Sequence, residues 1–227
     1  MQPPATAALR TLADRIAAAS EQAHGDPGAV RLLAVSKAKP AAAIRALAGA
    51  GQHAFGENYL QEAGAKIDAL ADLGIEWHFI GGLQSNKCRD VARRFDWAQS
   101  VDRERLLAPL AAGRAHGAAP LQVLLQVNID GEDGKSGCAP DAVDALAAMV
   151  AMHPQLRLRG LMAIPAPAGV RAQRRAPFAA MRRLFDALRS QHPQVDTLSM
   201  GMSDDFEDAI AEGATMVRIG TALFGPR

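Results

Sequence analysis

Short apolar runs alternate with longer amphipathic stretches along most of the chain. An Ala-rich amphipathic segment at 7–22 ends at a Gly- and Pro-containing turn, and eight β-like runs follow, the first seven each leading into a segment with helical spacing of its apolar positions. The predicted strands are 31–36, 53–55, 76–80, 96–99, 121–128, 156–162, 197–200 and 216–219. The predicted helices after them are 40–50, 58–70, 86–94, 103–116, 140–152, 177–191 and 204–212.

This regular alternation indicates an α/β fold with a parallel sheet. Parallel strands need crossovers, and strands covered on both faces are nearly continuous apolar runs, as residues 121–127 largely are. Eight repeats in roughly 200 residues match the lower size limit of a (β/α)8 TIM barrel. An open doubly wound sheet is the alternative. We predict a single TIM-barrel domain over 1–227, with an N-terminal helix and linker at 1–28.

The composition excludes several classes of function. The 227 residues are 49% hydrophobic and 22% charged with a formal net charge of +1, so no global charge attracts nucleic acid or an anionic membrane. No run of about 18 apolar residues could span a bilayer. Cys88 and Cys138 have the spacing of neither a disulfide framework nor a thiolate metal site. We expect a cytoplasmic protein without nucleic-acid or membrane partners and without a metal.

Candidate chemistry lies at the carboxyl ends of the predicted strands, where TIM barrels carry their reactive groups. Lys37 follows the first strand, and an amine in a partly apolar mouth can form a Schiff base with an aldehyde, although a solvated lysine is the alternative. The seventh strand leads into Gly201 and Ser203, and the eighth into Gly220 and Thr221. Two neighbouring turns of this kind predict a phosphate site.

Arg218 lies within the last predicted strand. A charge there is costly unless it is paired, so a solvent-facing arginine is one interpretation. If Arg218 faces the barrel interior instead, it could donate to the ring nitrogen of pyridoxal phosphate (PLP). The lysine, the phosphate site and the arginine together suggest that cofactor.

Seven ordered blocks resemble the pyridoxal phosphate homeostasis protein family. They are AVSK at 34–37, FGENY at 55–59, WHFIG at 77–81, LQSNK at 83–87, RGLMAIP at 159–165, LSMGMSDD at 198–205 and VRIGT at 217–221. The resemblance implies a barrel similar to the N-terminal domain of alanine racemase, with PLP joined to Lys37 and its phosphate held around Ser203, Gly220 and Thr221. One departure is Gly82, where many members have proline, so we expect a more flexible loop.

Two further residues complete the predicted cofactor site. Asn58 is placed either to cap a helix or to face the cofactor. Met200 ends the seventh strand and either packs against the cofactor ring or belongs to the core. The predicted cofactor-binding set is Lys37, Asn58, Met200, Gly201, Ser203, Arg218, Gly220 and Thr221.

Other polar residues receive structural interpretations. We expect His78, away from the carboxyl end of its strand, to be a satisfied buried histidine. Lys135 lies in a segment that superficially resembles a P-loop but lacks the upstream glycine, so we expect a solvated loop lysine. The segment 165–177 is predicted to be a mobile basic loop that could act as a lid.

The remaining question is whether such a protein is an enzyme or a carrier. A racemase needs proton-transfer groups on both faces of the substrate, and Tyr59, at a predicted helix start, is poorly placed to supply the second. An arginine at the ring nitrogen also weakens the cofactor as an electron sink. The sequence ends at Arg227, after the eighth repeat, so we expect no second domain of the alanine racemase kind.

The leading hypothesis is therefore a monomeric PLP carrier or buffer in intracellular vitamin B6 homeostasis, without robust catalysis, that supplies PLP-dependent client enzymes. One alternative is a PLP-dependent amino-acid racemase or decarboxylase. Another is a barrel that recognises a phosphorylated metabolite without covalent chemistry.

Overall fold

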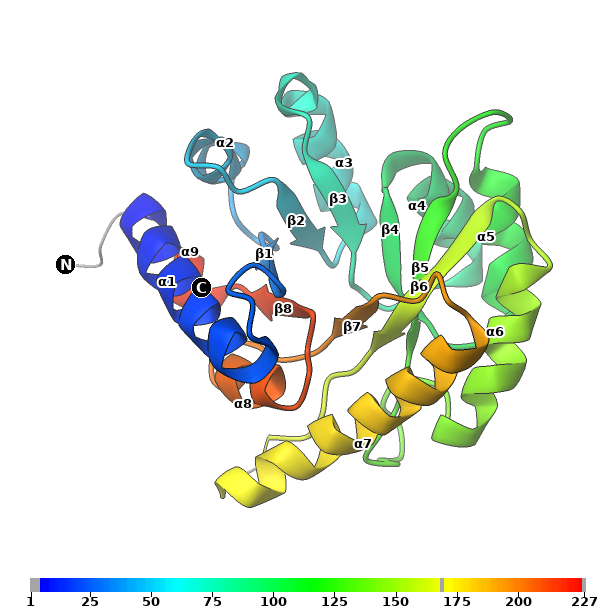
Figure 1. Cartoon of the computed structure of the whole chain (residues 1–227). Coiled ribbons are helices and arrows are strands. Elements are labelled where there is room, and N and C mark those ends of the chain that lie inside the picture. Colours follow the sequence, from blue (N-terminus) through cyan, green and yellow to red (C-terminus); the bar gives the residue numbers. More distant parts are fainter. Residues whose placement is uncertain (1–4, 168–169, 226–227) are drawn as a thin grey trace.

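Eight parallel strands close into a barrel in the computed structural model, which describes residues 5–167 and 170–225 (Figure 1). The strands are β1 (Arg31–Val35), β2 (Ala54–Glu57), β3 (Glu76–Phe79), β4 (Trp97–Val101), β5 (Leu121–Gln126), β6 (Leu156–Met162), β7 (Thr197–Ser199) and β8 (Met216–Ile219). Each strand pairs with its sequence neighbour, and β8 returns to β1 in a register from Arg31 opposite Met216 to Ala34 opposite Ile219. This closure confirms the predicted TIM barrel and excludes the open sheet.

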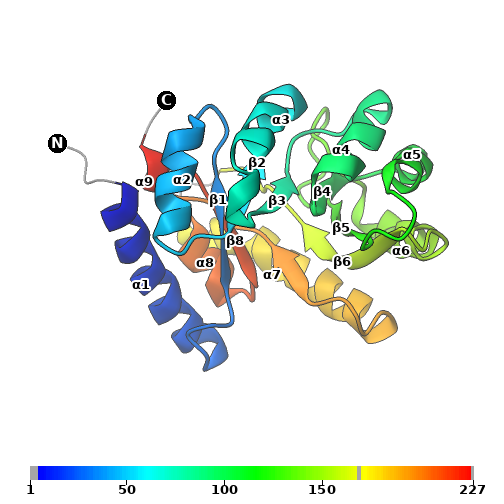
Figure 2. The ribbon, with the colours of Figure 1, turned by 90° about the horizontal axis from the view of Figure 1, so that it is seen from above.

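Helices cover the outside of the barrel, as the second view shows (Figure 2). They are α1 (Ala5–His24), α2 (Ala41–Gly49), α3 (Leu60–Ala69), α4 (Cys88–Arg94), α5 (Leu107–Gly113), α6 (Val143–Ala151), α7 (Arg171–Gln191), α8 (Phe206–Ala211) and α9 (Thr221–Phe224). The extra N-terminal helix α1 packs against α8, α9 and α2 beside the β8–β1 closure. Within the described residues, no helix has both the length and the apolar character needed to cross a membrane.

The barrel interior holds two small apolar groups with polar side chains between them. One group comprises Leu33, Ala54 and Met216, and the other comprises Trp97, Leu124 and Met162. The main core lies between the strands and the helices and includes large buried residues such as Phe55, Phe185 and Phe206. Because side chains alternate between the faces of a strand, Met216 and Arg218 share the inward face of β8. The inward orientation of Arg218 therefore follows from the register.

The segment expected to be a mobile loop is largely helical. Helix α7 begins at Arg171, six residues before the expected start at Pro177, which lies inside the helix. Ion pairs to α8 and the turn after it, Arg174 with Asp208 and Arg175 with Glu212, hold the extension in place. The prediction took Pro177 as a first-turn proline and could not see these tertiary pairs. Residues 168–169 of the same segment lie outside the described residues.

The second strand also differs from its predicted bounds. It extends to Glu57, because Gly56 pairs with Val35 of β1 and Glu57 pairs with Phe79 of β3. Helix α3 accordingly begins at Leu60 rather than at residue 58. Asn58 is therefore a loop residue at the carboxyl end of β2, and Tyr59, not Asn58, holds the position before the helix.

Candidate functional site

A cavity of about 280 Å³ lies at the carboxyl ends of the strands, and we call it the mouth cavity. Its walls come from the loops that follow six of the strands, as expected for a barrel of this kind. The lining residues are Val35, Lys37, Asn58, Ile80, Ile164, Met202, Ser203, Asp204, Arg218, Gly220 and Thr221. Six of the eight predicted site residues therefore lie together: Lys37, Asn58, Ser203, Arg218, Gly220 and Thr221.

The turn that carries Lys37 is conformationally unusual. Ala38, the next residue, has a φ of 59°, the one positive φ at a non-glycine position among the residues described. The left-handed region costs a residue with a Cβ roughly 1–2 kcal/mol. The N–H of Ala38 donates to Oε1 of Glu62 on α3 over 2.6 Å, which holds this backbone in place. Strain of this kind gathers at functional sites, where surrounding contacts fix the backbone.

A buried ionic cluster lies behind that turn and joins β1, β2 and α3. The Nζ atom of Lys66 is 2.7 Å from Oε1 of Glu57, 2.6 Å from Oε1 of Glu62 and 2.8 Å from the carbonyl oxygen of Ser36. The hydroxyl of Ser36 also donates to Oε1 of Glu57 over 2.6 Å. Burial raises the pKa of Glu57 above its usual value, against the lowering effect of the hydrogen bonds from Lys66 and Ser36. The cluster thus fixes the residue immediately before Lys37.

Asn58 lines the mouth cavity and carries an unsatisfied polar atom. Its Oδ1 atom is buried and has no hydrogen-bond partner among the residues described. Buried polar atoms are nearly always hydrogen-bonded, so such an exception calls for a missing partner. Gly81 makes the position possible, because a Cβ there would collide with the carbonyl oxygen of Asn58. Asn58 therefore fits a residue that accepts a hydrogen bond from a ligand.

Ser203 connects the two turns in which the phosphate site was predicted. Its Oγ atom accepts a hydrogen bond from the N–H of Ala222 over 3.2 Å, which brings the loop after β7 against the first turn of α9. The loop is closed on itself by Asp205, whose Oδ1 accepts from the N–H of Met202 over 2.6 Å. Burial raises the pKa of Asp205, against this hydrogen bond and the positive charge of Arg218. Ser203, Gly220 and Thr221 all line the mouth cavity.

Arg218 reaches the mouth cavity from inside the barrel. It is 4% exposed, and its Nη1 and Nη2 atoms donate to Oγ of Ser199 over 2.9 Å and to the carbonyl oxygen of Ala163 over 2.8 Å. Burial lowers the pKa of Arg218 to about 10, partly opposed by the charge of Asp205, so the guanidinium is a cation at neutral pH. The solvent-facing interpretation of Arg218 is therefore wrong, since closure of the barrel turns this face of β8 inward.

The other two predicted residues, Met200 and Gly201, do not line the mouth cavity. Met200 is fully buried in the main core. Gly201 has a φ of 91°, and a Cβ there would lie 2.6 Å from the Cβ of Ala209 on α8. The glycine therefore allows close packing between the β7 loop and α8.

The sequence interpretation missed the apolar part of the lining. Val35, Ile80, Ile164 and Met202 lie beside the polar residues around the cavity. The period-2 pattern could have found some of them, because Val35 and Ile80 continue the inward faces that Leu33 and His78 occupy lower in the barrel. The ionic cluster gave no comparable signal, because its partners come from different elements.

Two other residues that the sequence analysis considered, His78 and Lys135, form contacts away from the mouth cavity. His78 is fully buried and bonded through both ring nitrogens, to Glu76 over 2.6 Å and to Gln99 over 2.9 Å, which confirms the expected satisfied histidine. Lys135 is exposed in the loop after β5 and pairs with Glu132. Neither residue lines the mouth cavity.

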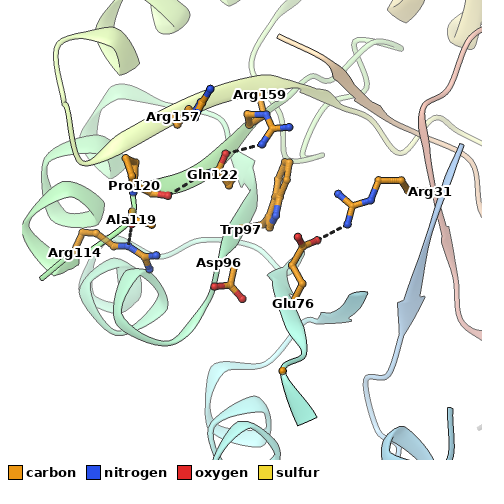
Figure 3. Close-up of a pocket in the computed structure, with 11 residues that line it drawn as sticks. Arg31, Glu76, Asp96, Trp97, Arg114, Ala119, Pro120, Gln122, Arg157 and Arg159 are labelled. Atoms are coloured by element: carbon orange, nitrogen blue, oxygen red, sulfur yellow. Dashed lines mark hydrogen bonds and ion pairs between the residues drawn. The ribbon is translucent and has the colours of Figure 1, made fainter. Parts of the chain in front are cut away.

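A second cavity, of about 490 Å³, lies at the amino ends of the strands, and we call it the floor cavity (Figure 3). Trp97 stands at its centre, and the guanidinium of Arg159 lies 4.9 Å from the centroid of that ring. Two of its arginines form ion pairs: Arg31 pairs with Glu76 of the same lining over 2.7 Å, and Arg159 pairs with Asp196, outside the lining, over 2.5 Å. In TIM barrels this face serves stability, and these ion pairs link strands at that end of the barrel.

Comparison with known proteins identifies the family. A model of the alanine racemase N-terminal domain matches residues 8–227. The pyridoxal phosphate homeostasis protein of Pseudomonas aeruginosa is 56% identical over 219 residues, covering 96% of this chain and 94% of that protein. The protein of the same name from Escherichia coli is 50% identical over 222 residues, covering 96% of this chain and 95% of its own length. The chain belongs to the pyridoxal phosphate homeostasis protein family. The resemblance carried by the seven sequence blocks is confirmed.

Two solved structures have a fold similar to that of this chain. PipY of Synechococcus elongatus, in a structure with PLP bound, is 41% identical and superposes with a TM-score of 0.81 over 94% of this chain and 100% of its own. Alanine racemase from Corynebacterium glutamicum, at 20% identity and a TM-score of 0.68, aligns over 94% of this chain and 61% of its own. The second likeness shows a shared barrel fold.

Proposed function

We propose that this chain binds PLP in the mouth cavity, as a Schiff base on Lys37, and acts in PLP homeostasis as a carrier or buffer. The proposal rests on one observation. Lys37, the turn residues Ser203, Gly220 and Thr221, and the buried Arg218 all line the same cavity. The names of the curated relatives and the PLP in the PipY structure support it.

The lining residues fit the chemistry of the cofactor. The Oδ1 atom of Asn58, buried without a partner, would accept a hydrogen bond from a bound molecule. Ser203, Gly220 and Thr221 would hold the phosphate group, and the fixed guanidinium of Arg218 would donate to the ring nitrogen. Val35, Ile80 and Ile164 would pack against the apolar ring faces.

The cofactor would supply an aldehyde, which condenses reversibly with an amine. Lys37 provides the amine, and the Ala38–Glu62 hydrogen bond and the Lys66 cluster hold its backbone at the cavity wall. Reversibility of this condensation is what a carrier needs.

Among the residues that the structure describes, the titratable ones that line the mouth cavity are Lys37, Asp204 and Arg218. A racemase would need a second proton-transfer group opposite the lysine, and Tyr59 is 59% exposed at the start of α3. Because Tyr59 is not in the described lining, it does not supply that group, which favours binding over amino-acid racemisation. We also propose that the chain works as a monomer in the cytoplasm and passes PLP to client enzymes; its two cysteines, buried free thiols, are compatible with a reducing compartment.

An absorption spectrum with added PLP tests the covalent assignment. We expect a Schiff-base band that borohydride reduction makes permanent, in the wild type and in Lys39→Ala but not in Lys37→Ala. Lys39 is the matched control because it lies in the same turn, with its Nζ atom bonded to the carbonyl oxygens of Phe224 and Gly225. A band that survives in Lys37→Ala would refute the assignment and leave the non-covalent phosphate-binding barrel as the better interpretation.

Turnover and transfer assays separate the carrier from the enzyme. The PLP-loaded protein should leave amino acids unchanged over many equivalents, and an apo PLP-dependent enzyme should recover activity when mixed with it. Repeated, Lys37-dependent racemisation or decarboxylation of an amino acid would refute the carrier role.

A further inference from the structure

A continuous line of hydrogen-bonded side chains crosses the barrel interior from the mouth cavity to the floor cavity. Arg218 Nη1 lies 2.9 Å from Ser199 Oγ, which lies 2.8 Å from Gln99 Oε1. Gln99 Nε2 lies 2.9 Å from His78 Nδ1, and His78 Nε2 lies 2.6 Å from Glu76 Oε1. Ser199, Gln99 and His78 are completely buried, and Glu76 ends the line beside Arg31 in the floor cavity (Figure 3).

The chemistry of the two ends sets the direction of every hydrogen bond between them. A guanidinium can only donate, so Ser199 Oγ accepts from Arg218 and turns its own proton to Oε1 of Gln99. The amide of Gln99 then donates through Nε2, which makes Nδ1 of His78 an acceptor and places the imidazole proton on Nε2. That proton is donated to the carboxylate of Glu76. All four hydrogen bonds point from the cation to the anion.

The ionisation of the participants agrees with this direction. Burial lowers the pKa of His78, against the raising effect of Glu76, so the imidazole is neutral and keeps one acceptor nitrogen. Burial disfavours the charged form of Glu76, but the hydrogen bonds that it accepts from His78 and Arg31, with the charge of Arg31, outweigh this and lower its pKa to about 2. Trp97 stacks on the His78 ring with centroids 5.0 Å apart and fixes the ring plane. A fully satisfied buried network of this kind specifies a single arrangement.

We propose that Ser199, Gln99 and His78 are positioning residues for Arg218. Ser199 and the carbonyl oxygen of Ala163 each hold one terminal nitrogen of the guanidinium, so its remaining donors are fixed relative to the mouth cavity. The consequence for a bound ligand rests on the proposed function: a fixed cationic donor would keep the ring nitrogen of PLP unprotonated, as an acceptor. No one of the three residues lines the mouth cavity, and they would act through Arg218 alone.

The hydrogen-bond direction is tested on the protein without cofactor. Nitrogen-15 NMR of labelled histidine at pH 7 should find His78 protonated on Nε2 and unprotonated on Nδ1. An Nδ1–H tautomer or an imidazolium at that pH would overturn the proposed direction.

The positioning of Arg218 is tested with Ser199→Ala, which deletes one hydroxyl from the middle of the line. In the wild type the immobilised guanidinium should give resolved, slowly exchanging Nη–H signals, and these should average in Ser199→Ala. Thr197→Val is the matched control, because Thr197 is on the same strand and its hydroxyl bonds to Asp196 outside the line. The control should keep the wild-type signals, and unchanged signals in Ser199→Ala would overturn the proposal.

PLP titration then measures the consequence in the cavity. We expect Ser199→Ala to weaken PLP binding about tenfold, since a hydrogen bond to a charged group is lost, and to shift the pH titration of the bound-cofactor absorption band. Thr197→Val should stay within about twofold of the wild type. Should Ser199→Ala not fold, Gln99→Met interrupts the same line while keeping the volume, with the same expectations. Failure of the wild type to bind PLP would refute the proposed function, while the two NMR experiments would still decide the positioning role.

Discussion

The Nζ atom of Lys66 lies 2.7 Å from Oε1 of Glu57, in a pair whose side chains are 8% and 0% exposed. Lys66 also donates to the carbonyl oxygen of Ser36 over 2.8 Å, one residue before Lys37. Lys66 therefore connects α3 to the carboxyl ends of β1 and β2, next to the mouth cavity. Buried ions are stable only with their partners present, because each alone would be desolvated without compensation.

Removing one partner of this pair should be strongly destabilising. We expect Lys66→Met to lower the free energy of unfolding by about 3–5 kcal/mol, since the buried carboxyl group of Glu57 would lose its cationic partner. Urea unfolding at pH 7 measures this loss. Lys135→Met is the control, because Lys135 forms an exposed pair with Glu132 and should change stability by less than about 1 kcal/mol. Equal effects of the two substitutions would contradict the structural importance assigned to the buried pair.

Asn58 should matter for binding more than for stability. Its Oδ1 atom has no partner in the described structure, so Asn58→Ala removes no folding hydrogen bond at that atom. We expect PLP affinity to fall about tenfold, measured by fluorescence titration, with little change in thermal unfolding. The control is Asn86→Ala, at an exposed asparagine outside the mouth-cavity lining. Unchanged PLP affinity in Asn58→Ala would contradict its role as a ligand contact.

Gly201 should be required for packing. In Gly201→Ala the new Cβ would lie 2.6 Å from the Cβ of Ala209, at a φ of 91°. We expect a loss of about 1–3 kcal/mol in urea unfolding from strain and overpacking. Gly82→Ala is the matched control, since a Cβ there meets no atom within 4 Å and φ is not positive, and it should change stability by less than about 0.5 kcal/mol. A neutral Gly201→Ala would show that α8 moves aside freely.

Glu76 should contribute to stability in a defined pH window. Burial alone would raise its pKa, but the hydrogen bonds from His78 and Arg31, with the charge of Arg31, outweigh burial and lower the pKa from 4.5 to about 2 in the folded protein. The lowered pKa means that the folded state favours the carboxylate, so the stabilisation is complete above pH 4.5 and is lost as pH falls toward 2. The stability difference between the wild type and Glu76→Gln should therefore shrink between those limits in urea unfolding. A difference independent of pH would contradict the linkage.

Both cysteines should be inert in the native protein. Burial raises the thiol pKa of Cys88 and of Cys138 to about 11, and both side chains are buried. At pH 8 the thiolate fraction is then about a hundredfold below that of a thiol with a pKa of 9, and access is restricted as well. We expect negligible labelling by a disulfide reagent in buffer and labelling of two thiols per chain in denaturant. Rapid native labelling of either cysteine would contradict its buried position.

The sequence by itself determined the fold class and most of the mouth cavity. Eight repeats of strand and helix can be read locally, because helical and strand periodicities depend on residues near in the chain. In a barrel the carboxyl ends of the strands converge at one face. The barrel prediction alone therefore places Lys37, Asn58 and the loops after β7 and β8 close together. The extent of the domain, 1–227, remains a prediction of the sequence.

The tertiary structure alone decided which polar groups are paired. Gln99 meets His78 and Ser199 across the closed barrel, and Lys66 meets Glu57 between a helix and a strand. Helix α7 begins before Pro177 because its arginines find carboxylates on α8 and in the turn after it. These outcomes depend on register and on the relative positions of elements distant in sequence, and a polar residue carries no local mark of its partner. Closure of the barrel brings those partners together. It also places Arg218 on the inward face of β8, where it is a buried hydrogen-bond donor at the mouth cavity.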